Sequence, residues 1–491
     1  MKNRIAAAAA LLLLGVGTTS AQTTAFHKLV VVGDSLAAGH EANCTVERYQ
    51  RRGASALLAE ALGIADFQQP LLAETPATNP PTSYPCLGAV VVGGSIGVGI
   101  ISQEGAQLNA TLPRPYDNLG FNGGPRVKDF VDLRVSVPGR SDLDNYAARV
   151  LRNVAGSPFE GTNAVEQAAS LAPDLALYWV GNNDLLGAAT TGVVVDGVTL
   201  TPVDAFRAKY VEGLTTIFSA GPTVVTFTIP NVTSIPLFTT LPPVVIDPAT
   251  RQPVIIDGHP VPLLGSRALP PDCPVAPCPL PNGTLLNTIR AGLLLQQGIG
   301  VPAFLGGRAV QGSGDLTTAL PYGTITASGL QPGVVLYPDG LAAILARTTE
   351  INDVIRSISA EDGTVLVDLN TLFQDVAANG YHIGGVTLTS AFLSGGLFSA
   401  DGVHPSAAGY AILADYIIQA INTQRPGISP IPRPNLGAAL FTPNVPPFGT
   451  AVTMPGFHPD KWLLDLPVFE ASPPAAEPLS DRRPSTRTVA R

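Results

Sequence analysis

Four short apolar runs, separated by segments of helical pattern, constrain the fold of this chain most strongly. The runs are rich in β-branched residues and cover residues 29–32, 175–180, 223–229 and 365–369. Helical patterns cover residues 55–62, 163–172, 204–219, 341–359 and 407–421. Strands that alternate with helices are typical of a parallel sheet covered on both faces, so we predict an α/β fold.

Two long segments interrupt this alternation, at about residues 63–134 and 234–337. The first looks irregular, and the second is Pro-rich before one helical pattern over 285–297. We interpret both as insertions into one domain that spans residues 22–425. From residue 426 to 491 proline is frequent and periodicity is lost, which indicates an extended surface arm that becomes disordered.

The N-terminus has the order of a secretory signal. Lys2 and Arg4 precede an apolar run, residues 6–17, that is too short to span a bilayer, and small residues follow up to Ala21. We predict a signal peptide over residues 1–21, a mature chain that begins near Gln22, and a secreted or periplasmic location. The alternative is a buried first helix. No later segment has ~18 uninterrupted apolar residues, so we expect no transmembrane segment.

Charge and cysteine content indicate which kinds of ligand and cross-link this chain can have. Apolar residues make up 45% of the chain, and the formal charge of −9 leaves no basic field for a nucleic acid. For an exported protein the simplest disulfides are Cys44 with Cys86 and Cys273 with Cys278, although four cysteines allow three connectivities. A zinc site is the alternative, but it lacks CxxC spacing and nearby histidines, so we expect no metal. Composition does not define the oligomeric state.

Ser35 is the candidate nucleophile. It follows the first apolar run in Gly33-Asp34-Ser35, where a strand should end and a helix begin. Ligands bind at such carboxyl ends of parallel strands, and a serine there exposes its hydroxyl and an unpaired helix N-terminal amide. The alternative is a helix N-cap without chemistry.

His404 is the candidate base. It is the only one of the six histidines with a carboxylate three residues earlier, Asp401, in the sequence Asp-Gly-Val-His-Pro. That spacing lets Asp401 accept a hydrogen bond from Nδ1–H and orient the ring. A surface loop that contains Asp and His is the alternative.

Two further residues are candidate oxyanion donors beside the Ser35 amide. Asn183 comes just after the run at 175–180, and Gly139 follows a β-branched run at 131–137. We expect the side chain of Asn182 to point away from the sheet edge. Asn and Gly are also common in turns, which is the alternative for both donors.

A second serine, Ser95, must be weighed against Ser35. Gly93-Gly94-Ser95-Ile96-Gly97 fits the GxSxG nucleophile elbow of α/β-hydrolases, and a strand pattern precedes it. The elbow requires a helix after the serine, and residues 98–109 show no strong helix start. A Gly-rich turn is the alternative.

The blocks Gly33-Asp34-Ser35-Leu36, Gly139, Gly181-Asn182-Asn183-Asp184 and Asp401-Gly402-Val403-His404-Pro405 follow one another in this order. Together they resemble the four blocks of the SGNH/GDSL hydrolase superfamily, and the first extends to Gly39 as in GDSLxxG. The Gly139 block departs most, because Arg and Ser follow where the family usually has small residues.

The resemblance implies a three-layer α/β/α, flavodoxin-like fold and an esterase or lipase without a cofactor. It assigns Ser35 as nucleophile, His404 as base, Asp401 as its partner, and Ser35, Gly139 and Asn183 as the oxyanion hole. The implied substrate is a small-molecule or lipid-like ester. Apolar residues at 238–246 and 391–398 would suit an acyl-chain groove, and ordinary core packing is the alternative for both segments. The alternatives are a carbohydrate acetylesterase and a non-catalytic secreted binding protein on a hydrolase scaffold.

Overall fold

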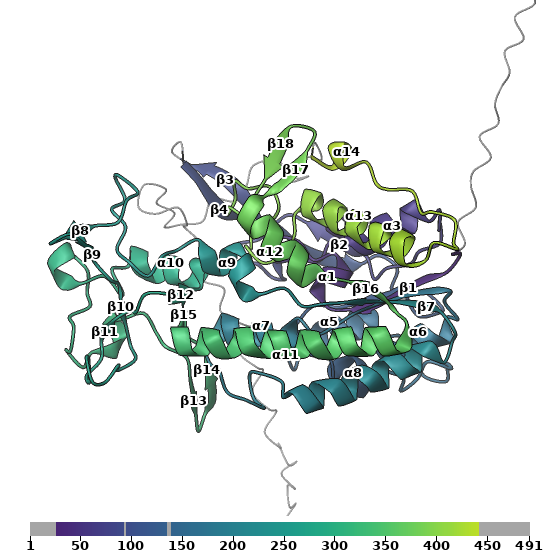
Figure 1. Cartoon of the computed structure of the whole chain (residues 1–491), viewed down its shortest axis with the longest axis horizontal. Helices are drawn as coiled ribbons and strands as arrows, with labels where there is room; N and C mark the ends of the chain where they lie inside the picture. The colour runs from purple at the N-terminus through teal and green to yellow at the C-terminus, as the bar shows by residue number, and fades with distance from the viewer. Residues whose placement is uncertain (1–25, 93–94, 135–138, 441–491) are drawn as a thin grey trace, which may run out of the picture.

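A five-stranded parallel sheet forms the centre of the molecule (Figure 1). The computed structural model describes residues 26–92, 95–134 and 139–440. The strand order is β16-β7-β6-β1-β5. The bounds are β1 Leu29–Gly33, β5 Asn118–Gly120, β6 Leu175–Trp179, β7 Thr223–Phe227 and β16 Val365–Val367. The predicted α/β class is confirmed. The four apolar runs that predicted strands form β1, β6, β7 and β16.

Helices cover both faces of the sheet, so β1 and β6 are buried along their whole length (Figure 1). Val30 and Val32 belong to one hydrophobic core, whereas Leu29 and Val31 belong to the other. The first core lies against α6, α8 and α11, and the second lies against α3 and α13. The bounds are α3 Ala54–Ala61, α6 Ala164–Ser170, α8 Val203–Phe218, α11 Pro338–Asp362 and α13 Ala407–Gln424.

The predicted helices begin where local chemistry permits. Asn163 and Glu166 form a capping box at α6, and Ser406 Oγ accepts from the Gly409 amide at α13. Other helices are α1 Ser35–Ala38, α2 Glu47–Gln50, α4 Asp129–Asp132, α5 Asp142–Val150, α7 Asn183–Thr191, α9 Pro236–Thr239, α10 Thr288–Gln296, α12 Leu369–Asn379 and α14 Leu436–Leu440. The hairpin β17 Tyr381–Ile383 and β18 Val386–Leu388 follows α12.

The first insertion is not irregular, and that prediction is wrong. It contains an antiparallel sheet of order β2-β4-β3, with bounds β2 Leu72–Thr75, β3 Pro85–Val92 and β4 Ser95–Gln107. Ile96, Val98 and Ile100 alternate with glycines, which is a strand period that the Gly content obscures. The boundary at residue 134 is also too late, because β5 pairs with β1 in the main sheet.

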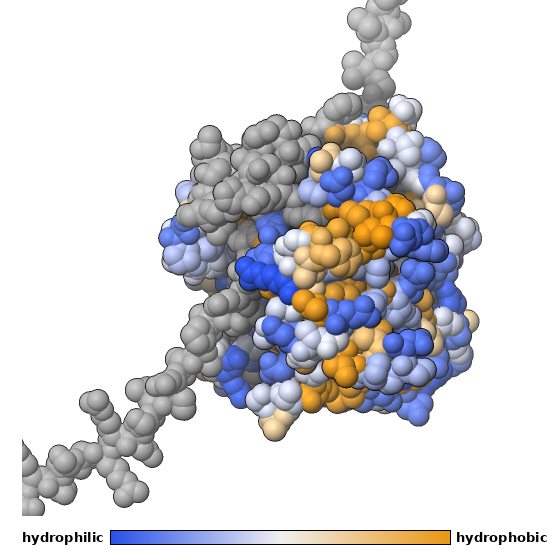
Figure 2. All heavy atoms as spheres, turned by 90° about the vertical axis from the view of Figure 1, so that its left-hand side faces the viewer, coloured by the Kyte–Doolittle hydropathy of each residue, from blue (hydrophilic) through white to orange (hydrophobic). Residues whose placement is uncertain are grey.

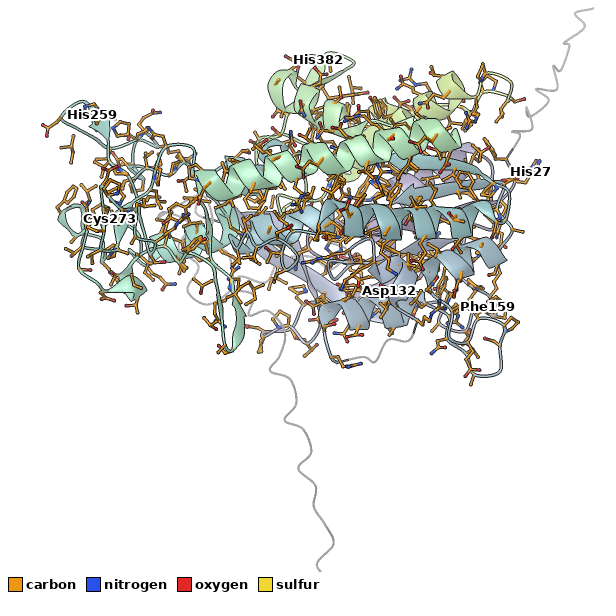
Figure 3. All side chains as sticks on the ribbon, turned by 60° about the horizontal axis from the view of Figure 1, so that its bottom comes forward. His27, Asp132, Phe159, His259, Cys273 and His382 are labelled. Atoms are coloured by element: carbon orange, nitrogen blue, oxygen red, sulfur yellow. A yellow bond between two sulfur atoms is a disulfide. The ribbon has the colours of Figure 1, made fainter. Side chains whose placement is uncertain are left out.

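The second insertion forms a lobe of its own at the left of Figure 1, where Figure 3 labels His259 and Cys273. Its short strands are β8 Ile255–Ile256, β9 His259–Pro260, β10 Leu264–Gly265, β11 Cys278–Pro279, β12 Leu285–Leu286, β13 Thr324–Thr326, β14 Gly329–Gln331 and β15 Val335–Leu336. A separate core, which includes Leu263, Leu286 and Tyr337, supports the lobe. Figure 2 faces this end, where patches of hydrophobic surface lie among hydrophilic ones.

The chain ends carry predictions that lie outside the described residues. These are the signal peptide at 1–21 and the disordered end of the extension from residue 441. The start of the extension contains α14. None of the helices in the described ranges combines the length and hydropathy that a bilayer span requires.

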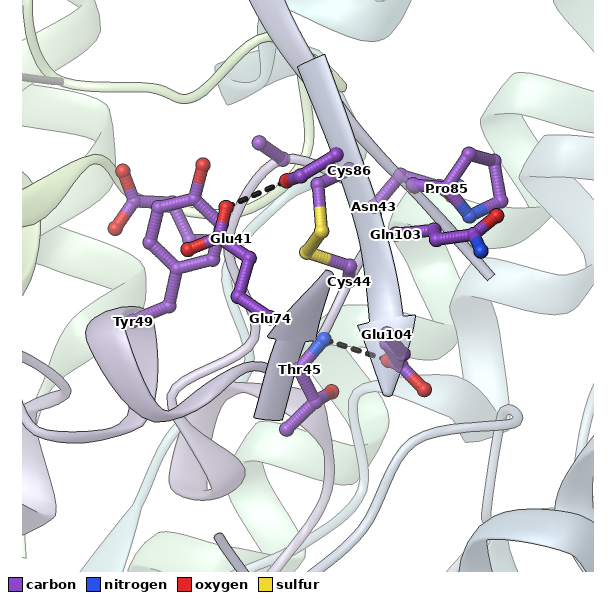
Figure 4. Close-up of a disulfide and its surroundings, with 12 residues drawn as sticks. Glu41, Asn43, Cys44, Thr45, Tyr49, Glu74, Pro85, Cys86, Gln103 and Glu104 are labelled. Carbon is purple, nitrogen blue, oxygen red and sulfur yellow. Dashed lines mark hydrogen bonds between the residues drawn. A yellow bond between two sulfur atoms is a disulfide. The ribbon is translucent and has the colours of Figure 1, made fainter. Parts of the chain in front are cut away.

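All four cysteines are paired as the simplest scheme predicts. Cys44 bonds Cys86, which joins the loop after α1 to β3 (Figure 4). Cys273 bonds Cys278 within the lobe. Both Cys44 and Cys86 are fully buried in a small core with Val46, Tyr49 and Leu87, so this bridge ties the first insertion to the sheet.

The two disulfides should contribute unequally to stability. Cys44–Cys86 spans 42 residues of sequence and Cys273–Cys278 spans 5. Loop-closure entropy predicts that Cys44→Ala/Cys86→Ala costs about 4 kcal/mol, and that Cys273→Ala/Cys278→Ala costs about 2 kcal/mol. Urea denaturation of both double variants beside the parent measures this difference. Equal losses would contradict the prediction.

Candidate active site

The turn from β1 into α1 places Ser35 at the carboxyl edge of the sheet. Gly33 ends β1, and a Cβ at this residue would lie 2.6 Å from the carbonyl oxygen of Trp179 in β6. Only glycine therefore lets the two strands approach so closely here. Asp34 caps α1 by accepting from the Leu36 amide at 3.0 Å. Ser35 is the first residue of α1, so its own N–H has no acceptor within the helix.

His404 lies between Ser35 and Asp401. Its Nε2 is 2.9 Å from Ser35 Oγ, and its Nδ1 is 2.8 Å from Asp401 Oδ2. Ser35 and His404 are half-buried, and Asp401 is buried. The structure thus brings together all three residues predicted as the catalytic set. Their order is that of a nucleophile, a base and a group that orients the base.

The Asp401 carboxylate is surrounded by hydrogen-bond donors. Its Oδ1 accepts from the amides of Val403 and His404 and from Ser399 Oγ, at 2.8, 2.9 and 3.1 Å. Its Oδ2 accepts from the Asn43 amide at 2.8 Å. Burial acts to raise the pKa of Asp401, but chiefly the charge and the hydrogen bonds of His404 outweigh it and hold the pKa well below its usual range. Asp401 is therefore a fixed negative charge against Nδ1.

Asn182 does not point away from the sheet edge, and that prediction is wrong. Its Nδ2 donates to Asp34 Oδ2 at 2.8 Å, because residue 182 follows β6, which is the strand beside β1. Burial raises the pKa of Asp34 to about 6, and the bond from Asn182 opposes that rise. Asn182 therefore holds the residue that caps the Ser35 helix.

Asn183 begins α7 and lines the same pocket as Ser35 and His404. The wall of this pocket is mostly apolar and includes Leu185, Leu186, Ile229, Pro230, Val232, Ile235 and Phe373. The structure thus places Asn183, the first residue of α7, in the wall of the pocket that Ser35 also lines.

Gly139 lies elsewhere, and the structure argues against its predicted role. Its amide donates to Asn145 Oδ1 at 2.7 Å in an exposed turn before α5, so that hydrogen is already engaged. The β-branched run at 131–137 that precedes Gly139 overlaps helix α4, and residues 135–138 lie outside the described ranges. The neighbours of β1 are β6 on one side and β5 on the other, with Gly120 of β5 opposite Gly33.

The sequence did not single out His40, which is part of the site. Its ring packs edge-on against His404 with centroids 4.4 Å apart, and its Nδ1 lies 2.7 Å from Thr45 Oγ1. Asn122, in the loop after β5, lies 3.1 Å from the same nitrogen. Burial and the charge of His404 lower the pKa of His40 well below its usual value, so His40 is a neutral wall of the site. Its position directly after the Gly39 of the first block is the only signal in the sequence.

A metal ion is the other chemistry to test at this site. In the described ranges, His40, Asp401 and His404 form a group whose ligand atoms lie within 4.8 Å of one another. However, both nitrogens of His404 already face Ser35 and Asp401, and the Asp401 oxygens accept four other donors. A metal would have to displace these contacts, so the donor set suits proton transfer.

Ser95, the alternative nucleophile, does not lie in the structural context that an α/β-hydrolase requires. Ser95 begins β4, which pairs antiparallel with β3, so a strand and not the helix of a nucleophile elbow follows it. His27, His259 and His382 lie on separate parts of the surface (Figure 3).

No protein-family model matches the chain, and a search of the curated proteins finds none that is significantly similar. Inference about function therefore rests on the geometry of this site.

The bond from Asn182 to Asp34 generates a prediction for stability. Asn182→Ala removes a donor from a buried carboxylate, which should cost about 2 kcal/mol. Because the pKa of Asp34 is raised to about 6, the fold favours its protonated form, and losing the donor raises that pKa further. The destabilisation should therefore be larger at pH 8 than at pH 5.

Thermal melts of Asn182→Ala at both pH values measure the effect. Asn379→Ala is the matched control, because Asn379 makes the same kind of bond to Asp375, at 2.7 Å, on the exposed surface. A loss that is independent of pH, or equal to that of the control, would contradict the role given to Asn182.

Proposed function

We propose that this protein is a serine hydrolase that cleaves carboxylic esters through an acyl-enzyme on Ser35. The observation that carries the proposal is the continuous chain from Ser35 Oγ through both nitrogens of His404 to the buried Asp401. The 2.9 Å and 2.8 Å links are within hydrogen-bond reach, which is the geometry that activates a serine hydroxyl.

The steps follow from this geometry. His404 Nε2 takes the Ser35 proton as Oγ attacks the ester carbonyl, and Asp401 stabilises the resulting imidazolium. The same Nε2 then gives the proton to the alcohol oxygen as the carbon–oxygen bond breaks. Water, deprotonated by His404 Nε2, next attacks the acyl carbon. The bond from that carbon to Ser35 Oγ then breaks, His404 returns the proton to Oγ, and the acid is released.

The oxyanion forms above the N-terminus of α1, where the Ser35 amide and the Asn183 side chain line one pocket. We assign the third donor to a backbone amide of the loop after β5, residues 122–124, in place of Gly139, because the Phe121 amide already donates to the Gly33 carbonyl oxygen at 3.1 Å. This loop leaves the sheet beside Gly33, and its Asn122 already reaches His40 at 3.1 Å.

An apolar cavity favours an acyl chain as the acid portion of the substrate. Phe373 lines the Ser35 pocket and also an adjoining apolar cavity with Leu397, Phe398 and Ile412. From the segment 391–398, Leu397 and Phe398 line this second cavity, and their place in an acyl-chain groove stays a prediction, whereas Phe238 is buried in the core. Activity that rises with chain length on p-nitrophenyl esters supports this substrate class. Preference for acetylated xylan would favour the carbohydrate esterase.

We further propose that the chain is a secreted SGNH/GDSL hydrolase with a flavodoxin-like, three-layer core. Numbered along the chain, the main-sheet strands stand in the order 5-4-3-1-2, which is the flavodoxin-like arrangement. The carboxyl ends of β1 and β6 carry Ser35 and Asn183, as that family requires. The two disulfides support a secreted location, because disulfides persist in oxidising compartments outside the cytosol.

The nucleophile is tested by a pair of serine variants. Ser35→Ala should lower kcat/KM for a soluble ester by at least about 10⁴-fold and abolish labelling by a fluorophosphonate. Ser95→Ala should retain both activities, because Ser95 begins a strand of the first insertion. The reverse pattern would favour an α/β-hydrolase site, and a parent protein that neither labels nor hydrolyses would favour a binding protein.

Asn183 tests the oxyanion hole. Asn183→Ala should lower kcat by about 10²–10³-fold and change KM little, because the bond forms mainly in the transition state. Steady-state kinetics on one soluble ester, with thermal melts, separates this effect from folding. A melted variant, or a loss no larger than that of Asn182→Ala, would mean that Asn183 only shapes the turn.

A further inference from the structure

A second cleft, of about 420 Å³, opens beside His404. Val403 and His404 line both this cleft and the Ser35 pocket, but Ser35 and Asn183 line only the pocket. The other wall of the cleft is α10 of the second insertion, together with Leu237 of α9 and Leu87 of β3. The insertion therefore adds a second compartment to the catalytic base.

The walls of the cleft are largely apolar, with Asn43, Asn287 and Gln297 among them, and in the part of the chain that the structure describes they carry one cation without a carboxylate partner. Ile289, Leu293 and Leu294 face it from α10, and Ile289 and Leu293 also pack against the core that holds Cys44–Cys86. Its charged residues are Arg290, Asp401 and His404. Asp401 and His404 are bound to one another, so Arg290 is the cation left to face a ligand.

Arg290 is an exposed side chain on the wall of the cleft, and no carboxylate among the described residues is hydrogen-bonded to it. Its side-chain contact is a 3.4 Å bond from Nη1 to the carbonyl oxygen of Gly333. In Arg134, Arg267 and Arg433 a hydrogen bond to a carboxylate raises the pKa. Partial burial instead lowers the pKa of Arg290, and no nearby carboxylate opposes that effect.

The position of Arg290 in its helix adds to this conclusion. It lies in the first turn of α10, which has no acidic residue, and its amide donates to the capping side chain of Asn287. The positive end of the helix dipole disfavours a cation there. The Arg290 guanidinium and the positive end of the α10 dipole thus both lie at this cleft. An anion bound in the cleft would be attracted to both.

We propose that this cleft binds the alcohol portion of an ester that carries an anionic group, a carboxylate or a phosphate, and that Arg290 holds that group. The inference rests on the proposed ester hydrolysis. His404 Nε2 must reach the leaving alcohol oxygen, so the alcohol lies against His404 while the acyl chain occupies the Ser35 pocket. A guanidinium binds carboxylate and phosphate through paired N–H donors, which suits this role.

A matched pair of substrates tests the proposal. One is p-nitrophenyl butanoate, and the other is the same ester with a carboxylate ortho to the nitro group. The intrinsic reactivities of the two esters cancel when variants are compared. Arg290→Gln should lower kcat/KM for the anionic ester about tenfold or more and change the neutral ester less than about twofold. Arg290→Glu should lower kcat/KM for the anionic ester, relative to kcat/KM for the neutral ester, further than Arg290→Gln does.

Arg308→Gln is the control, because Arg308 is, like Arg290, an exposed arginine of the second insertion but does not line the cleft. It should leave both esters unchanged. Benzoate and phenyl phosphate should inhibit hydrolysis of the neutral ester competitively in the parent and much less in Arg290→Gln. The tighter inhibitor identifies which anionic group the cleft prefers.

The outcomes separate this proposal from the proposed function. If the parent hydrolyses neither ester, or if Ser35→Ala retains the activity, the hydrolase assignment fails. If the parent hydrolyses both esters and Arg290→Gln changes them equally or not at all, the hydrolase assignment stands and the role of Arg290 is overturned.

Discussion

A buried carboxylate that must stay charged organises the site. Asp401 is surrounded by protein, and a carboxylate in that position is stable only if its lone pairs are satisfied. Donors come from the Asp401–His404 turn itself, from Ser399, and from the Asn43 amide of the loop after α1. The carboxylate thus joins the loop after α1 to the turn before α13, and the imidazole of His404 is held over Ser35 as a consequence.

The loop that supplies the Asn43 amide is itself constrained from several sides. Ala42 and Asn43 have φ of 54° and 65°, a conformation that costs energy in residues other than glycine. Cys44–Cys86 fixes the loop on one side, and Tyr410 of α13 donates to the carbonyl oxygen of His40 at 2.5 Å on the other. These contacts stabilise a strained backbone, as is common where a segment must present one donor accurately.

The two insertions have different relations to this core. The first packs its antiparallel sheet against the loop that carries Asn43 and contributes Leu87 of β3 to the wall of the cleft beside His404. The second brings α10 against Val403 and His404, so it forms a wall that a substrate would contact. The Ser35–His404–Asp401 group therefore lies at the carboxyl edge of the sheet, whereas the insertions form much of the wall of the cleft beside it.

The sequence by itself determined the α/β class, the strand that ends at Ser35 and the pairing of Asp401 with His404. These features depend on local patterns: the alternation of strand and helix periods, a glycine at a strand end, and a spacing of about one turn. The tertiary structure alone decided that β5 lies beside β1, that Asn182 supports Asp34, and that His40 and Arg290 flank His404. Strand order and the docking of α10 are set by packing between segments far apart in the chain. No local pattern encodes that packing, and for this reason neither the position of β5 nor the engaged amide of Gly139 could be predicted from the sequence.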